Sequence, residues 1–225
     1  MDLYFILVKP AVPGNIGAAA RAIKTMGYNR LRLVAPCDYL GQEARMLAHA
    51  SEEILESAQV FAGLKDAIAD LDMNVATTAK TRDVRVEYFS ASEIPGVIRA
   101  KGNTMNKVGL VFGREESGLT NNEIRMCDLV SSIPMKLSYP SLNLGQSVMI
   151  YAYIMASFER TETEPTSHSL DKEGFRAMMD KSKKVLKDLD IDRNPALYNR
   201  VLERLASLGE DDIHLLHSIL NRYLK

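Results

Sequence analysis

Short β-rich runs alternate with helical stretches along the first 158 residues, and this alternation constrains the fold more than any other feature of the chain. The expected strands span residues 3–8, 31–36, 74–78, 107–113 and 129–135. The expected helices span residues 15–27, 42–58, 63–71 and 92–100, and a further helix opens at Leu144. Because helical crossovers join parallel strands, we predict an α/β fold with a mostly parallel sheet and helices on both faces.

Local signals mark several of the helix ends. Gly27 is placed to end the helix that starts near residue 15. Thr120 and Glu123 have the spacing of a capping box and predict a helix start. The last helix of this region carries an apolar face with helical spacing, formed by Leu144, Val148, Tyr151, Met155 and Phe158.

The alternating pattern ends at a polar stretch, "TETEPTSHS" at residues 161–169, which has no periodicity and reads as a linker. Beyond it, helices are expected at about 171–189, 196–208 and 211–224. We therefore predict an α/β domain over residues 1–160, a linker over 161–170 and a C-terminal helical extension over 171–225.

Composition narrows the class of protein. Hydrophobic residues at 46% and charged residues at 25% are ordinary globular values. The formal net charge of −1 argues against nucleic-acid binding by bulk electrostatics, although it leaves room for a local basic patch. The chain has two cysteines, no basic leader and no apolar run near the roughly 18 residues of a membrane span, so we expect a soluble cytoplasmic protein.

Four strand ends carry unusual loops, at residues 9–21, 77–82, 112–119 and 133–147. Ligands of open α/β sheets bind at this edge. In the first loop, Gly14 and Gly17 flank a helix start whose free backbone N–H groups could hold an anion, and a tight turn is the equal alternative. None of the loops matches G-x-G-x-x-G or a Walker loop, so the motifs of a nucleotide-dependent oxidoreductase and of an NTPase are missing.

Three of these loops, taken together, resemble the signature motifs of SPOUT-class RNA 2′-O-methyltransferases, nearest to the TrmJ/LasT branch. The matching segments are Asn15 with Arg21, "LVFGREESGLTNNE" at residues 110–123, and "IPM" followed by "YPSLNLGQSV" within residues 133–148. The resemblance implies a C-terminal deep trefoil knot, which the usual rules of chain topology would have rejected. It also implies a homodimer with the helices at 15–27 and 144–158 in its interface.

By the same resemblance, the cofactor is S-adenosylmethionine and the substrate is the ribose 2′-hydroxyl of structured RNA, with tRNA expected and rRNA as the alternative. The positions that match cofactor contacts are Thr77, Thr78, Ala79, Gly113, Ile133, Pro140, Ser141 and Leu142. Their chemistry suits adenine, which needs apolar surfaces and a few fixed polar groups. For Ile133 or Leu142 alone, core packing is the simpler reading.

The resemblance implies Arg21, Ser141 and Asn15 as the catalytic residues. Arg21 matches an arginine described in the family as the general base. A guanidinium is effectively always protonated, however, so stabilisation of the reacting oxygen and grip on a phosphate is the alternative role. Asn15 could orient the substrate or Arg21, or it could cap the helix. Glu115 is expected to tie its loop to a neighbouring loop or subunit.

The candidates for RNA contact are cations in or beside the loops: Lys9, Lys24, Lys80, Arg82, Arg85 and Arg114. Each of them taken singly could instead be a solvated surface charge. Further along, His214 and His217 stand three apart on an expected helix without a third ligand, so we predict no metal site. A non-catalytic RNA-binding module is the second hypothesis for the chain, and the presence of Asn15, Arg21 and Ser141 speaks against it.

Overall fold

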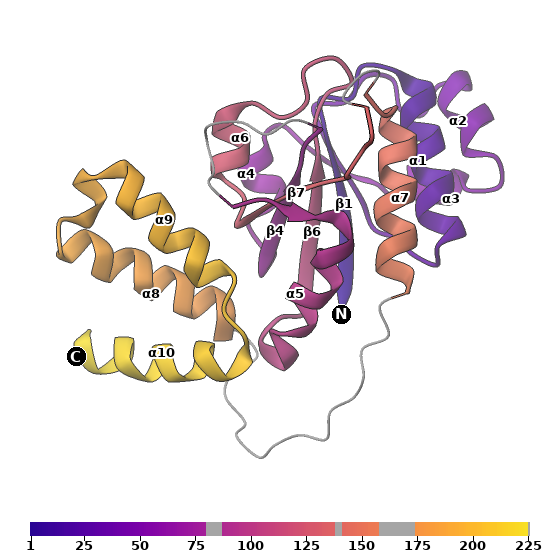
Figure 1. The fold of residues 1–225 in the computed structure, drawn as a ribbon. Coiled ribbons are helices and arrows are strands. Elements are labelled where there is room, and N and C mark those ends of the chain that lie inside the picture. The colour runs from indigo at the N-terminus through magenta and orange to yellow at the C-terminus, as the bar shows by residue number, and fades with distance from the viewer. Residues whose placement is uncertain (80–86, 138–140, 158–173, 225) are drawn as a thin grey trace.

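A parallel sheet of seven strands forms the centre of the molecule, in the order β3-β2-β1-β6-β4-β7-β5 (Figure 1). The computed structural model describes residues 1–79, 87–137, 141–157 and 174–224. The strands are β1 (Asp2–Val8), β2 (Leu31–Val34), β3 (Gln59–Phe61), β4 (Met73–Thr77), β5 (Phe89–Ser90), β6 (Lys107–Phe112) and β7 (Leu129–Ser132). Neighbouring strands pair in parallel throughout, which confirms the predicted fold class.

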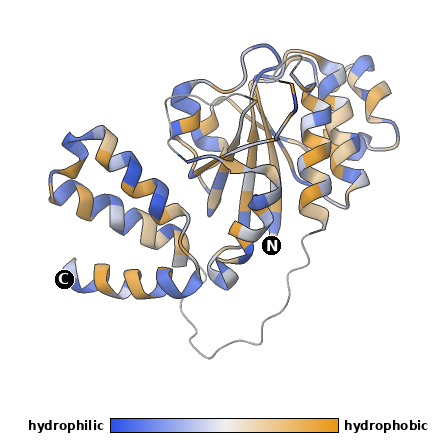
Figure 2. Ribbon diagram, viewed as in Figure 1, coloured by the Kyte–Doolittle hydropathy of each residue, from blue (hydrophilic) through white to orange (hydrophobic). Residues whose placement is uncertain are grey.

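Helices cover both faces of this sheet, and Figure 2 shows apolar strands between them. On one face the core includes residues of α1 (Pro13–Thr25), α2 (Gln42–Ala48), α3 (Glu52–Glu56), α5 (Ile94–Arg99) and α7 (Leu144–Ala156). On the other face it includes residues of α4 (Leu64–Ala67) and α6 (Asn121–Arg125). Short 3₁₀ turns, η1 (Ala91–Glu93) and η2 (Gly102–Thr104), flank α5.

The predicted elements match these apart from several differences. The helix expected over residues 63–71 is the shorter α4, which ends at Ala67, and the strand expected over residues 31–36 ends at Val34. The short edge strands β3 and β5 were not predicted. The helix expected over residues 42–58 is wrong as a single element, because His49 (φ 29°) and Ala50 (φ 59°) break it into α2 and α3. The strand expected to reach residue 135 ends at Ser132, and the predicted capping box of Thr120 and Glu123 is present at α6.

Small residues let α1 lie close to two neighbouring helices. A Cβ atom placed on Gly17 would be 2.1 Å from the carbonyl oxygen of Ala44 in α2. A Cβ atom on Gly145 of α7 would be 2.8 Å from the Cβ of Ala18. The packing of α1 between α2 and α7 therefore depends on these side chains being absent or small.

Three further helices form the C-terminal part of the molecule: α8 (Gly174–Asp188), α9 (Pro195–Ala206) and α10 (Glu210–Tyr223), with a 3₁₀ turn at Ile191–Arg193. They agree with the expected helices to within three residues. The predicted linker, 161–170, lies outside the described residues, so the division into domains stays a prediction. No described helix is both long enough and apolar enough to cross a membrane.

Polar contacts tie this C-terminal part to the α/β part. The fully buried Lys101 donates from Nζ to the carbonyl oxygen of Leu208 at 2.7 Å and lies 4.7 Å from the centre of the Phe175 ring. Burial lowers the pKa of Lys101 to about 8. At the amino ends of the strands, Arg176 of α8 contacts Asp128 at 3.3 Å. The helices of the extension are therefore docked on the sheet domain through specific partners.

A buried arginine anchors the second strand. Arg32, 3% exposed, donates to both carboxylate oxygens of Asp70 at 2.6 and 3.0 Å and to the carbonyl oxygen of Ala67 at 2.7 Å. Its guanidinium also lies 4.2 Å from the centre of the Tyr4 ring. The hydrogen bond from Arg32 is the main reason that the pKa of Asp70 falls to about 2.

Asp70→Asn should therefore lower the free energy of unfolding at pH 7 by about 1 kcal/mol. This is less than the shift in pKa alone implies, because solvent screens the half-exposed carboxylate. Because the folded pKa lies below the unfolded value, the stabilisation is present above about pH 4 and fades as the pH falls toward 2. Urea unfolding at several pH values tests this, with Asp66→Asn, an exposed aspartate of α4, as control. A difference that stays constant down to pH 2.5 would contradict it.

Candidate active site

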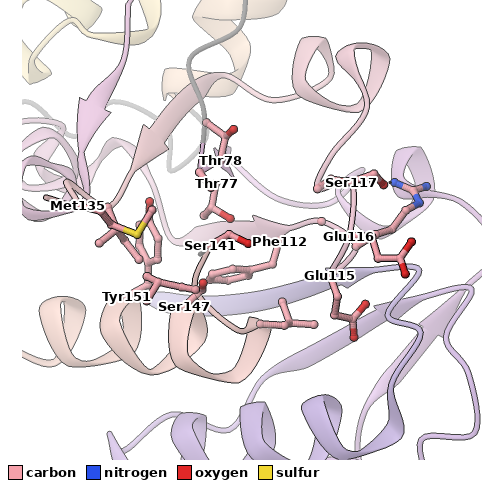
Figure 3. Close-up of a pocket in the computed structure, with 17 residues that line it drawn as sticks. Thr77, Thr78, Phe112, Glu115, Glu116, Ser117, Met135, Ser141, Ser147 and Tyr151 are labelled. Atoms are coloured by element: carbon pink, nitrogen blue, oxygen red, sulfur yellow. Dashed lines mark hydrogen bonds between the residues drawn. The ribbon is translucent and has the colours of Figure 1, made fainter. Parts of the chain in front are cut away.

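A pocket of about 280 Å³ opens at the carboxyl ends of β4, β6 and β7. Its lining comes from residues 77–79 at the end of β4, residues 112–118 at the end of β6, Ile133 and Met135 after β7, Ser141 and Leu142, and Leu144, Ser147 and Tyr151 of α7. Figure 3 shows Met135 and Tyr151 at one end of this pocket and Glu115, Glu116 and Ser117 at the other. The strand ends thus bring together three of the four loops that the sequence singled out.

The predicted cofactor positions gather at this pocket. Seven of them line it, namely Thr77, Thr78, Ala79, Gly113, Ile133, Ser141 and Leu142. The eighth, Pro140, lies outside the described residues. The two leucines on either side of Asn143, Leu142 and Leu144, both belong to the wall. Their role toward a cofactor stays a prediction, but their placement in one cavity is a structural fact.

Gly113 is required by a tight reversal of the chain at the pocket's edge. Arg114 and Gly118 pair in an isolated antiparallel bridge just beyond it. A Cβ atom on Gly113 would lie 2.1 Å from the carbonyl carbon of Gly118, which is backbone and cannot rotate away. The turn therefore needs glycine because of this close approach.

Glu115 ties the β6 loop to the start of α1. Its carboxylate accepts hydrogen bonds from the backbone N–H groups of Ala11 and Val12, at 3.0 and 3.2 Å, and from Nδ2 of Asn15 at 3.0 Å. Burial alone would raise the pKa of Glu115, but these hydrogen bonds outweigh it and the pKa lies below its ordinary value. The contact predicted for Glu115 with a neighbouring loop is present. Glu115 thus binds the N–H groups of Ala11 and Val12, which precede α1, whereas anion binding at the helix start flanked by Gly14 and Gly17 stays a prediction.

Asn15 extends this connection to the third loop. Its Oδ1 accepts a hydrogen bond from Nδ2 of Asn143 at 2.7 Å. Asn143 in turn caps α7, where its side chain accepts from the N–H of Gly145 and Gln146 completes a capping box. The cap of α1 is Val12, so the alternative role of Asn15 as a helix cap is wrong. Asn15 instead links the loops after β1, β6 and β7.

Glu115→Gln should lower the free energy of unfolding by about 1–3 kcal/mol, because hydrogen bonds to a charged, partly buried acceptor are lost or weakened. Thermal unfolding followed by circular dichroism measures the change. Glu116→Gln provides the matched control, since Glu116 is exposed and makes no hydrogen bond or ion pair with another residue that the structure describes. Equal melting temperatures for the two variants would show that the Glu115 contacts do not stabilise the fold.

Arg21 does not reach the pocket. It lies six residues after Asn15 on α1, which corresponds to about 9 Å along the helix axis and a rotation of about 240°. Its side chain is exposed, and it is not part of the pocket lining. Of the three predicted catalytic residues, Ser141 lines the cavity, Asn15 lies beside it and Arg21 points elsewhere.

The predicted RNA-binding cations have different surroundings. Lys9 is exposed and has a positive φ of 50° at the end of β1. Lys24 pairs with Glu53 and donates to the carbonyl oxygen of Ala50. Arg114 forms a two-pronged ion pair with Glu123, with both distances 2.9 Å. The remaining three, Lys80, Arg82 and Arg85, lie outside the described residues.

The histidines of α10 have partners within the C-terminal helices. His217 lies 3.1 Å from Nζ of Lys181, and His214 lies 3.8 Å from Glu210. Across the residues that the structure describes, no three His, Cys, Asp or Glu side chains gather in a way that could hold a metal ion.

Sequence reasoning did not assign to the pocket several residues that line it: Phe112, Met135, Ser147 and Tyr151, together with Glu116 and Ser117, which read as loop surface. Tyr151 was assigned to the apolar core face of its helix, and it is indeed 1% exposed. Ser147 stands between Leu144 and Tyr151 on the same helical face, so this spacing was the available signal. A residue that closes a deep pocket cannot be distinguished from core by periodicity alone.

Comparison with known proteins defines the class. A sequence model of the SpoU rRNA methylase family matches residues 2–153, and one of the C-terminal domain of the tRNA/rRNA methyltransferase LasT matches residues 172–225. The chain belongs to the SpoU methylase family, in the branch that contains LasT and TrmJ. The resemblance inferred from the three motifs is thereby confirmed.

Relatives and solved structures show how far the similarity extends. The uncharacterized tRNA/rRNA methyltransferase LasT of Escherichia coli is 37% identical over 221 residues, covering 98% of this chain and 96% of LasT. The tRNA (cytidine-2′-O-)-methyltransferase TrmJ of Methanocaldococcus jannaschii is 37% identical over 152 residues, covering 66% of this chain and 64% of TrmJ. The crystal structure of TrmJ from Z. mobilis superposes with a TM-score of 0.68 at 28% identity, covering 100% of both chains.

Proposed function

We propose that this protein transfers the methyl group of S-adenosylmethionine to a ribose 2′-hydroxyl of tRNA. The observation that carries the proposal is the pocket, where two of the three signature segments of a SpoU methylase, 110–123 and 133–148, meet the loop after β4 at the carboxyl ends of the strands. Relatives in the TrmJ group are named as tRNA 2′-O-methyltransferases, and this chain spans about 60% of their length.

The pocket residues fit the cofactor. Apolar side chains, including Ile133, Leu142 and Leu144, offer flat surfaces for a neutral adenine. The hydroxyl groups of Thr77 and Ser141 are among the polar groups at the wall. Gly113 allows the backbone to approach a ligand closely. When bound, S-adenosylmethionine supplies a methyl group on a positively charged sulfur, which a nucleophile can attack.

Arg21 would assist the attacking 2′-oxygen by electrostatics. A hydroxyl is a poor nucleophile until its proton is lost or loosened, and a guanidinium remains protonated, so it cannot readily take that proton. It can stabilise negative charge that develops on the oxygen and hold the adjacent phosphate through paired N–H donors. Ser141, at the pocket, would hydrogen-bond to the reacting groups.

For Arg21 to do this, a second copy of the chain must supply it, and we therefore propose a homodimer. Arg21 lies one helical turn beyond Ala18, which packs on Gly145 of α7. Helix α7 is apolar along much of its surface (Figure 2), and its residues Met149, Ile150 and the 67%-exposed Tyr153 are not fully buried. A two-fold interface built on α1 and α7 would bury this face and bring the Arg21 of the partner subunit toward the pocket.

The trefoil knot expected from the resemblance also stays part of the proposal. It is supported by the family membership and by the sheet order, which inserts the late strand β7 between the earlier strands β4 and β5. An experimental backbone trace through residues 133–157 tests the knot directly. A trace that never passes through another loop would refute it.

Methyl transfer from labelled S-adenosylmethionine to unmodified tRNA and to rRNA tests the proposed function. Mass spectrometry of the digested RNA should find a 2′-O-methylated nucleoside in the tRNA. Methylation of rRNA alone would support the alternative substrate, and methylation of a base would refute the proposed chemistry. RNA binding without any transfer would favour the non-catalytic module.

A further inference from the structure

One buried hydrogen bond lies directly behind the pocket. The hydroxyl of Tyr151, two turns into α7, donates to Oγ of Ser131 on β7 at 2.8 Å. Both residues are buried, at 1% and 0% exposure. Burial raises the pKa of the Tyr151 hydroxyl, so the group stays neutral and is available as a donor.

This bond joins the two ends of the longest pocket loop. The chain leaves β7 at Ser132 and enters α7 at Leu144, and the loop between them contributes Ile133, Ser141 and Leu142 to the wall. The bond between Tyr151 and Ser131 connects the elements on which both ends of the loop stand, and it fixes their separation.

Ser131 also supports a second wall of the same cavity. Its carbonyl oxygen accepts a hydrogen bond from the backbone N–H of Thr78 at 2.9 Å, and Thr78 lines the pocket. The side chain of Ser131 thus faces α7 while its backbone holds the loop after β4. A shift of β7 relative to α7 would move two walls of the pocket together.

The ring of Tyr151 is itself part of the lining. It stands edge-on to Phe112, with ring centres 5.6 Å apart and planes at 82°, and Phe112 lines the pocket as well. Because its hydroxyl is engaged with Ser131, Tyr151 offers ring carbons to the cavity. The hydrogen bond therefore fixes both the loop ends and the aromatic wall.

We infer that Tyr151 and Ser131 form a positioning pair that sets the affinity of the pocket for S-adenosylmethionine. The inference rests on the proposed function, because it concerns the same pocket. It goes beyond that proposal because it states that the affinity for S-adenosylmethionine depends on a hydrogen bond that does not itself touch the ligand. Ser131 and the hydroxyl of Tyr151 have a positioning role, since they act through the walls that their hydrogen bond holds in place.

Isothermal titration with S-adenosylhomocysteine, on the full-length chain, tests this inference. Tyr151→Phe and Ser131→Ala should each raise Kd about three- to tenfold, the range expected for one buried hydrogen bond. Because both changes remove the same bond, the double variant should raise Kd no more than the larger single change. Tyr223→Phe makes the same chemical change at an exposed tyrosine of α10 and should leave Kd within about twofold.

The titration separates a failure of this inference from a failure of the proposed function. If the single variants melt at lower temperature but bind the ligand like the unmodified protein, the pair is only part of the core and the inference is wrong. If the two increases in Kd multiply in the double variant, the effect does not come from the shared hydrogen bond and the inference is equally wrong. If the unmodified protein itself fails to bind, the proposed function is refuted and this inference with it. Tyr151→Phe keeps the ring, so a folded variant is available even if Ser131→Ala is not.

Discussion

Replacing Arg21 with alanine should lower methyl transfer to tRNA by about two to three orders of magnitude and leave the affinity for S-adenosylhomocysteine unchanged. The expected loss is large because a fixed cation beside the reacting oxygen is removed. Binding is preserved because Arg21 is absent from the pocket lining. Transfer rates at saturating cofactor and titration with S-adenosylhomocysteine measure the two effects. Arg125→Ala, at an exposed position of α6 across the sheet, is the control.

Mixing two inactive variants tests whether Arg21 acts across a dimer. Leu142→Glu places a carboxylate in the apolar wall and should abolish cofactor binding. In a random mixture with Arg21→Ala, half of the dimers are mixed, and each mixed dimer holds one intact composite site, so about a quarter of the activity should return. A mixture as inactive as its components would show that Arg21 does not serve a neighbouring pocket.

Gly113→Ala should disrupt the pocket. The new Cβ would meet backbone atoms of Gly118 at 2.1 Å, so the turn after β6 must move. We expect a loss of about 1–3 kcal/mol in the free energy of unfolding, typical of overpacking, and a Kd for S-adenosylhomocysteine at least tenfold higher. Chemical unfolding and calorimetry measure the two quantities.

Gly96→Ala is the matched control for this change. Gly96 lies in α5, has no atom within 4 Å of the new Cβ and does not have a positive φ. Alanine should leave the stability equal or raise it by up to about 1 kcal/mol, because it favours the helix. If Gly113→Ala bound the cofactor as tightly as Gly96→Ala, the close approach at Gly113 would not matter for the pocket.

The sequence predicted the regular elements well wherever periodicity was long. The run at residues 107–113 and the helix from Leu144 agree with β6 and α7 because a buried strand and a helix with regularly spaced apolar residues leave clear patterns. β5 could not be found in this way, since two residues show no alternation. The break between α2 and α3 occurs at His49 and Ala50 without a glycine or proline to mark it.

The candidate site could be predicted in part, because several of its residues lie at the ends of strands. Thr77, Gly113 and Leu142 follow strands in the sequence, and the carboxyl ends of parallel strands meet at one edge. The direction in which Arg21 points could not be predicted, because it depends on which sides of α1 are covered by α2 and α7. The hydrogen bonds of Glu115 and Asn143 with Asn15 span more than 95 residues of chain, so only the fold brings them together.

The family assignment also separates the alternatives. A nucleotide-dependent oxidoreductase explained the parallel sheet but lacked its glycine motif, and the match to the SpoU methylase family over residues 2–153 replaces that reading. LasT is matched along almost its whole length, whereas the TrmJ of Methanocaldococcus jannaschii is matched over 64% of its length. The C-terminal helices are thus shared with LasT.

A crystal structure with bound S-adenosylhomocysteine tests the central claim most directly. We predict that the ligand occupies the cavity between Thr77, Gly113 and Leu142, and that the guanidinium of a second copy's Arg21 faces its sulfur across a two-fold axis. A ligand bound at another place, or an Arg21 far from the sulfur in every copy, would contradict the account.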